Sequence, residues 1–157
     1  MADVLIVDDD PDVRAMLAIT LEDFGHKVRE APDGTKALLA LEESPPDVVV
    51  LDVMMPSLDG FGVLRERRRR ELAPDSRVMM LTCKTDERDF VRGWELGADE
   101  YLTKPFDPDT LVAKLGQLLE ATVEDLHTRR DEELQKAELL DRLESAFNRV
   151  RSRRVPA

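Results

Sequence analysis

The sequence is poor in cysteine and has no long apolar run. Cys83 is the only cysteine among 157 residues, so an internal disulfide is impossible. A chain that does not depend on disulfides suits a reducing compartment, and we expect it in the cytoplasm. The first ten residues, MADVLIVDDD, contain an apolar run that is too short for a signal peptide or a membrane span.

Positive charge is also scarce. The chain has 23 Lys and Arg residues against 34 Asp and Glu residues, a formal net charge of −11. Binding to nucleic-acid phosphates needs a clustered positive surface, so we expect no nucleic acid as the main partner. What the sequence does have is a hydrophobic fraction of 42%, which supports a packed core. The length predicts one domain with an appendage.

Short apolar runs alternate with helix-like stretches over the first 120 residues. Strands are expected at residues 4–7, 27–31, 48–51, 78–81 and 100–103, the first, third and fourth being apolar on both faces, as in buried parallel strands. Helices are expected at residues 11–24, 35–43, 60–71 and 86–96 and from Pro108 onwards, with Asp10 as the N-cap of the first. This alternation predicts an α/β fold, a flavodoxin-like doubly wound sheet of five parallel strands covered by helices.

Polar side chains follow several of these strands. Asp8 and Asp9 follow the first strand, Asp52 the third, Thr82 the fourth and Lys104 the fifth. The carboxyl ends of the strands form the ligand site in doubly wound folds, so we expect these side chains to meet. Crowded carboxylates need a cation, and Mg²⁺ prefers oxygen ligands. A carboxylate nucleophile with Mg²⁺ is one route to an acyl phosphate.

Four segments in order, VLIVDDDPDVR, VVVLDVMMPSLDGFGVL, VMMLT and GADEYLTKPF, resemble the successive signatures of the response-regulator receiver family. The resemblance runs from residue 3 to about residue 120. It implies a phosphoprotein of a two-component signal transduction system, in which Asp52 accepts a phosphoryl group from a sensor histidine kinase. It also implies that Asp9 and Asp52 ligate Mg²⁺ with the backbone carbonyl of Met54, and that Asp8 assists.

The resemblance further implies a switch. Thr82 and Lys104 are expected to hold the phosphoryl group, and Tyr101 is expected to change rotamer when Thr82 moves. The protein contacts that change lie on the face of the fourth helix, fifth strand and fifth helix. The Lys104–Pro105 peptide bond is expected to be cis. Cys83 stands where the family usually has a smaller residue, and it either narrows access to Asp52 or exposes a thiol.

Three charged residues resemble part of the set that receivers use to form dimers through the fourth and fifth helices: Arg92, Asp99 and Lys114. Thr110 stands where an acidic residue would complete that set. This departure puts the usual dimer mode in doubt.

The residues after the receiver domain (1–121) are expected to form a helical extension (122–157). Its apolar residues occupy a and d positions of a seven-residue repeat, namely Val112, Leu115, Leu119, Leu126, Leu140, Leu143, Phe147 and Val150. The middle of this seam is polar, with Thr122, Arg129, Glu133 and Lys136. The pattern predicts a helix continuous from Pro108 to about residue 152 with an interrupted coiled coil. A break near residues 127–131, or a stutter that brings Leu134 into the seam, would explain the interruption.

We expect this helix to make the protein a homodimer, because a lone helix with an apolar stripe gains little stability in water. A tail folded back on its own domain after a break near residue 130 is one alternative, and a solvated, fraying helix is another. About thirty-five residues are too few for a winged helix or a cyclase domain. The extension is therefore either the whole output or a connector to an output domain.

Two other functions compete with a phosphorylation switch. A Mg²⁺-dependent phosphohydrolase with Asp52 as its nucleophile would need a second acid two residues later, where this chain has Met54. A DNA-binding regulator finds support only in a basic cluster near the end, Arg149, Arg151, Arg153 and Arg154. We therefore expect the protein to catalyse only its own phosphorylation and dephosphorylation, and not to act as an enzyme on external substrates.

Overall fold

The structure, a computed structural model, describes residues 1–83 and 87–154. Its strands are β1 (Asp3–Val7), β2 (Lys27–Ala31), β3 (Val48–Asp52), β4 (Arg77–Thr82) and β5 (Glu100–Thr103). Its helices are α1 (Pro11–Asp23), α2 (Gly34–Glu43), α3 (Gly60–Arg70), α4 (Glu87–Glu95), α5 (Pro108–Glu120) and α6 (Val123–Arg153). Asp86, the expected first residue of the fourth helix, lies outside the described residues.

The five strands form one parallel sheet in the order β2-β1-β3-β4-β5. This order is that of flavodoxin-like folds, so the predicted fold class is confirmed. Aspartates begin four of the helices: the side chains of Asp10, Asp33, Asp59 and Asp107 each accept a hydrogen bond from a backbone N–H of the first turn. Asp10 is therefore a helix cap, as predicted.

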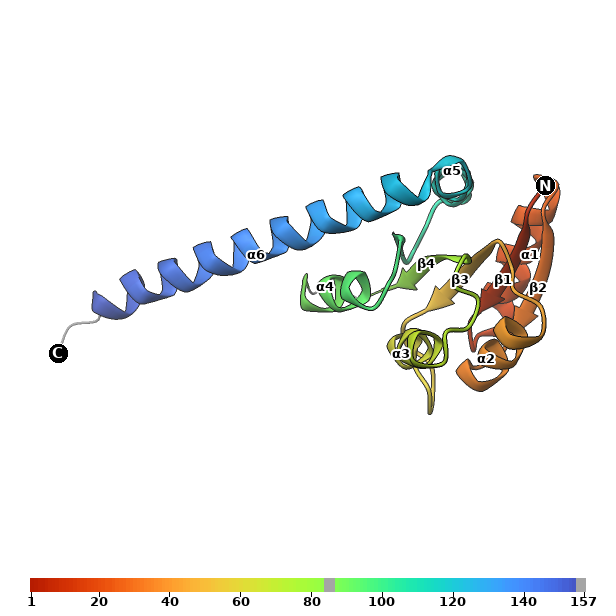
Figure 1. The fold of residues 1–157 in the computed structure, drawn as a ribbon, viewed down its shortest axis with the longest axis horizontal. Helices are drawn as coiled ribbons and strands as arrows, with labels where there is room; N and C mark the ends of the chain where they lie inside the picture. The colour runs from red at the N-terminus through yellow and green to blue at the C-terminus, as the bar shows by residue number, and fades with distance from the viewer. Residues whose placement is uncertain (84–86, 155–157) are drawn as a thin grey trace.

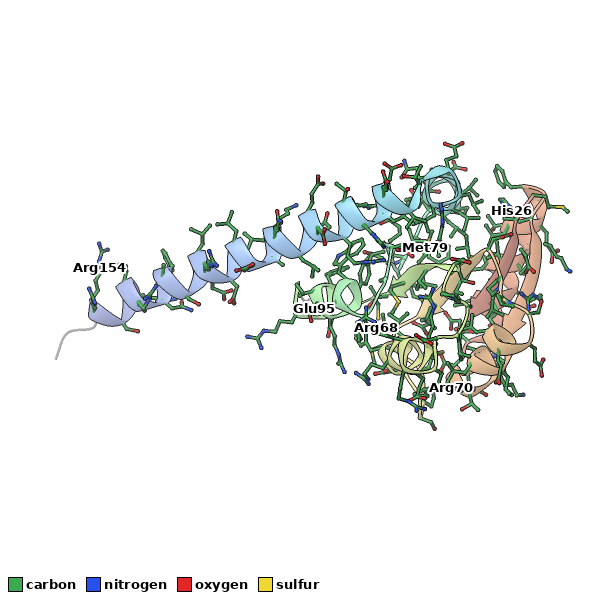
Figure 2. The ribbon with its side chains drawn as sticks, in the orientation of Figure 1. His26, Arg68, Arg70, Met79, Glu95 and Arg154 are labelled. Atoms are coloured by element: carbon green, nitrogen blue, oxygen red, sulfur yellow. The ribbon has the colours of Figure 1, made fainter. Side chains whose placement is uncertain are left out.

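Helices cover both faces of the sheet because successive strand residues point to opposite sides. In β3, Val48 and Val50 pack with α1 and α5, whereas Val49 and Leu51 pack with α2, α3 and α4. Met79 of β4 is fully buried and lies within the body formed by the sheet and its helices (Figure 2). The two apolar layers hold the carboxyl ends of β1, β3, β4 and β5 at one edge of the sheet.

The helix expected to run unbroken from Pro108 is instead two helices. Ala121 and Thr122 have extended backbones between α5 and α6, with ψ angles of 141° and 163°. The Thr122 hydroxyl accepts from the Asp125 amide, and the Asp125 carboxylate accepts from the Thr122 amide, both at 3.0 Å. This capping box satisfies backbone donors that would otherwise be unpaired, and it begins a new helix. The predicted break near residues 127–131 was wrong, since α6 passes through them without interruption.

The first half of α6 folds back on the domain and the second half projects from it (Figure 1). Leu126 is buried, and Leu134 packs against the core beside α4. Beyond them the apolar side chains are exposed: Leu139, Leu140, Leu143, Phe147 and Val150. The fold-back alternative thus describes the near half of α6, and the projecting helix describes the far half.

No helix in the described ranges 1–83 and 87–154 combines the length and the apolar character that crossing a bilayer requires.

Candidate functional site

The carboxyl ends of β1 and β3 bring three aspartates together. Asp8 and Asp9 follow β1, and Asp52 ends the neighbouring strand β3. One carboxylate oxygen from each lies within 4.8 Å of the other two. Asp8 and Asp52 are buried, with 0% and 4% of their surfaces exposed, whereas Asp9 is exposed. The cluster is therefore a buried carboxylate pair with one carboxylate open to solvent.

Lys104 supplies a positive charge to this cluster from the end of β5. Its Nζ lies 3.0 Å from Oδ2 of Asp8 and 3.5 Å from Oδ1 of Asp52. Burial by itself lowers the pKa of Lys104. The hydrogen bond to Asp8 and the charges of Asp52 and Asp8 raise this pKa by more than burial lowers it, so that the net change is an increase. The ammonium group therefore stays protonated, and one cation faces two buried anions.

The excess of negative over positive charge in this cluster is reflected in the pKa of Asp52. Burial and the charge of Asp8 raise the pKa of Asp52 from 3.8 to about 6. Lys104 and the backbone amide of Met54, 3.3 Å from Oδ1 of Asp52, act in the opposite direction and do not compensate. An oxygen-only group of this kind matches the preference of Mg²⁺ for hard carboxylate ligands, so the residues present fit that ion.

A glycine and an arginine set the positions of the two buried strand ends. A Cβ on Gly60 would lie 2.5 Å from the carbonyl oxygen of Asp52 and 2.9 Å from Cα of Val53, so only glycine lets α3 begin this close to β3. Arg14 of α1 donates to the carbonyl oxygen of Asp8 at 2.7 Å. Arg14 was missed at the sequence level, because a single arginine in an amphipathic helix carries no distinguishing signal.

Thr82 and Tyr101, the expected switch residues, lie on neighbouring strands. Thr82 is buried at the end of β4. The Tyr101 hydroxyl donates to the carbonyl oxygens of Asp89 and Phe90, at 3.0 and 3.1 Å, in the first turns of α4. Its ring meets Phe90 and Trp94 edge-on, with centroids 4.6 and 5.5 Å apart. Tyr101 is thus held against α4 in this conformation.

Gly93 makes that conformation of Tyr101 possible. A Cβ at Gly93 would lie 1.7 Å from the Tyr101 hydroxyl oxygen, which no side chain allows. Burial is the main reason why the pKa of Tyr101 is raised, so the hydroxyl remains a donor. Gly93 was not singled out at the sequence level, because a glycine within a helix gives no indication of which side chain crosses it.

The Lys104–Pro105 peptide bond is cis. Met54 is 53% exposed, and Cys83 is an exposed free thiol. The exposure of Cys83 agrees with the second of its two interpretations.

The charge set of the fourth and fifth helices is engaged within the chain. Asp99 pairs with Arg130 of α6, and Lys114 pairs with Glu100 at 3.2 Å. The Arg92 guanidinium lies 4.7 Å from the centre of the Phe61 ring.

Two arginines of α6 were missed as contact residues. Arg129 pairs with the buried Glu100, and its guanidinium lies over the Trp94 ring at 5.7 Å. Arg130 pairs with the buried Asp99 and donates to two carbonyl oxygens near it. For Arg129 a signal was present in the sequence, since it is one of the polar residues in the middle of the seven-residue repeat; Arg130 lies outside that repeat.

The chain is similar to known proteins over its first three quarters. The family described as the response regulator receiver domain matches residues 4–116. The DNA-binding dual master transcriptional regulator RpaA of Synechocystis sp. is 41% identical over 122 residues, 78% of this chain and 51% of RpaA. The phosphate regulon transcriptional regulatory protein PhoB of Pseudomonas aeruginosa is 40% identical over 119 residues, 76% of this chain and 52% of PhoB. The chain thus spans about half the length of these curated relatives.

Among solved structures, the chemotaxis protein CheY4 of Vibrio cholerae superposes with a TM-score of 0.72 and 37% identity. The match covers 76% of this chain and 99% of CheY4. The match to the receiver family ends at residue 116, before α6 begins.

Proposed function

The chain belongs to the response regulator receiver family of two-component signalling, and from this premise we propose that it is a switch phosphorylated on Asp52 by a sensor histidine kinase. The observation that carries the proposal is the placement of Lys104 against both buried carboxylates, Asp8 and Asp52, at 3.0 and 3.5 Å. A structural ion pair needs only one carboxylate. A second buried carboxylate with a raised pKa is typical of a reacting group.

The chain's own residues support phosphoryl transfer. Above a pH of about 6 Asp52 is mostly ionised, and its oxygen is free to form the new bond to phosphorus while the bond to the donor breaks. Lys104 offers its ammonium to the phosphoryl oxygens, and Thr82 offers a hydroxyl at the end of the adjacent strand. Mg²⁺, which Asp8, Asp9, Asp52 and the carbonyl of Met54 would hold, supplies the positive charge that offsets these carboxylates and the phosphoryl oxygens together.

The switch that we propose runs from Thr82 through Tyr101 to α4, β5 and α5. The phosphoryl group gives Thr82 a new hydrogen-bond partner, and its shift leaves room for Tyr101 to leave the α4 carbonyls. Tyr101 is flanked by Trp94, which Arg129 of α6 covers. The proposed output is therefore a change in the protein contacts of this face and of α6.

We propose no catalytic turnover on external substrates. Met54 occupies the position two residues after Asp52 where a phosphohydrolase needs its second acid, and its apolar side chain cannot supply one. Dephosphorylation of Asp52 in place is the only further chemistry proposed.

We propose a division into a receiver domain of residues 1–121 and a helical extension of residues 122–157. The far half of α6 exposes Leu143, Phe147 and Val150 along one side, and Figure 2 shows Arg154 at its far end, away from the body. Pairing of two such halves as a coiled coil would bury this stripe and give a homodimer. The net charge of −11 for the whole chain favours protein partners over nucleic acid, and a cytoplasmic location is proposed with them.

Intact mass spectrometry tests the phosphorylation site. The full chain is treated with acetyl phosphate and Mg²⁺, with and without excess chelator, beside Asp52→Asn and a matched control, Asp23→Asn, at an exposed position in α1. Wild type and Asp23→Asn should gain one phosphoryl mass only when Mg²⁺ is free. An Asp52→Asn chain that gains the same mass at the same rate would show the assignment to be wrong.

A further inference from the structure

One side of α6 is a docking surface built for its own domain. Its members recur at helical spacing and are buried or half-buried: Leu126, Arg129, Arg130, Glu133, Leu134 and Ala137. They face α4, β5 and α5, where Trp94, Asp99, Glu100 and Lys114 form what we call the receptor face. The contact with α4 is the largest that α6 makes with another helix or strand in the described residues. Figure 1 shows the near half of α6 running past α4.

Charge complementarity defines this contact. Glu100 and Asp99 are 3% and 6% exposed, and they are adjacent in the chain, as are Arg129 and Arg130 that pair with them. Each acid also has a second partner on the domain side: Lys114 for Glu100, and the backbone amide of Val78, at 2.9 Å, for Asp99. The arginine pair provides the partners that come from α6.

Removing α6 from the receptor face would break the ion pairs Arg130–Asp99 and Arg129–Glu100. Asp99 would keep the charge of Arg67 nearby, and Glu100 would keep Lys114. The loss of two ion pairs makes release of α6 unfavourable. The receptor face therefore favours a helix with adjacent arginines, whether its own α6 or that of another chain.

The link to α5 permits an exchange. It consists of Ala121 and Thr122, whose extended backbones are set by the capping box with Asp125, and it contains neither glycine nor proline. The apolar repeat of α5 continues in register into α6. If Ala121 and Thr122 became helical, α5 and α6 would therefore form one straight helix. A straight helix carries the docking surface away from its own receptor face.

We propose that the receptor face of one chain accepts α6 of a second copy, so that two chains exchange their α6 helices. The second copy is the partner because its α6 has the arginine pair and apolar residues that the receptor face already fits. This inference rests on the part of the proposed function that makes the protein a homodimer. It adds to that proposal the surface on which the second copy binds. A coiled coil between the projecting far halves of two α6 helices would form a dimer without such an exchange.

Charge-reversed full chains test the exchange. One chain has Glu100→Arg, the other has Arg129→Glu, and a third has both and restores the pair within one chain. Native mass spectrometry of the first two in equal amounts should show heterodimers in excess over either homodimer by about tenfold or more, because only the mixed dimer matches opposite charges at both receptor faces. The third chain, mixed with wild type, should show no such excess.

Two other outcomes of this mixture overturn the exchange. A statistical mixture of heterodimers and homodimers would mean that the far halves pair as proposed without exchange. Monomers alone would remove both the exchange and the proposed homodimer. Phosphorylation of Asp52, measured on the same samples, reports separately on the rest of the proposed function.

A second measurement avoids the buried position 100. The full chain with Arg129→Ala and Arg130→Ala changes only half-buried or exposed residues of α6 and leaves the receptor face intact. A synthetic peptide of residues 122–154 should bind this variant at least about tenfold more tightly than wild type, whose own α6 competes, and should change the fluorescence of Trp94. The same peptide with both arginines replaced by alanine should not bind. Equal binding of both peptides, or no binding of either, would overturn the proposal.

Discussion

Replacing Asp52 by asparagine should stabilise the fold at neutral pH when no divalent cation is present. The asparagine side chain would keep the size and most of the hydrogen-bonding capacity of the aspartate, while removing a charge that is buried beside Asp8. Burial and the charge of Asp8 raise the pKa of Asp52 more than Lys104 and the amide of Met54 lower it. The charged form of Asp52 is therefore a net burden on the folded state.

The size of the effect follows from the pKa. A rise from 3.8 to about 6 corresponds to about 3 kcal/mol, at about 1.4 kcal/mol for each tenfold change in proton affinity. Because the folded-state pKa is raised, the contribution of Asp52 is favourable and fully present below a pH of 3.8, and it is lost as the pH rises through about 6. The stability of Asp52→Asn relative to wild type should thus increase by about 3 kcal/mol between about pH 3.5 and pH 7.5.

Urea unfolding of both chains in chelator, across this pH range, measures the difference. All other titrating groups are shared, so they cancel in the difference to first order. Asp23→Asn, at an exposed position, is measured in parallel as the control for removing one carboxylate. Added Mg²⁺ should stabilise wild type more than Asp52→Asn. Curves for wild type and Asp52→Asn that stay parallel from about pH 3.5 to about pH 7.5 would refute the electrostatic reasoning.

Three further predictions concern the metal, the switch and the packing of Tyr101. Asp9→Ala should lower the affinity for Mg²⁺ by about tenfold or more in isothermal titration calorimetry, since it removes the exposed carboxylate of the cluster; an unchanged affinity would place the ion elsewhere. Thr82→Ala should still accept a phosphoryl group, but the change in hydrogen exchange over β5 and α4 seen with wild type should disappear, and its persistence would exclude Thr82 from the switch. Gly93→Ala should destabilise the protein by about 1–3 kcal/mol in urea unfolding, because its Cβ would overlap the Tyr101 hydroxyl. Gly116→Ala, in open space on α5, should be neutral or stabilising by up to about 1 kcal/mol, and equal effects of the two alanines would contradict the packing argument.

The sequence by itself determined the sheet and the residues at its edge. Three of the strands are short apolar runs, and the residue that follows a parallel strand lies at the carboxyl edge of the sheet, because parallel strands align their ends. The strand ends therefore place Asp8, Asp52 and Lys104 at the same edge of the sheet, with Asp8 and Asp52 on neighbouring strands. Their distances and the raised pKa of Asp52 required the structure, since both depend on burial and on the direction in which each side chain points.

Only the tertiary structure decided what the extension does. The seven-residue repeat predicts one helix from Pro108, but a two-residue link and a capping box divide it, and the capping box is a local signal that the longer repeat concealed. A periodic pattern shows which residues share one side of a helix, not which surface that side meets. Arg129 interrupts a coiled-coil seam in the sequence and Arg130 lies beside it, and the fold shows them paired with Glu100 and Asp99, which lie about thirty residues earlier in the chain. Sequence spacing cannot reveal such a pairing, because it depends on where the chain returns to its own domain.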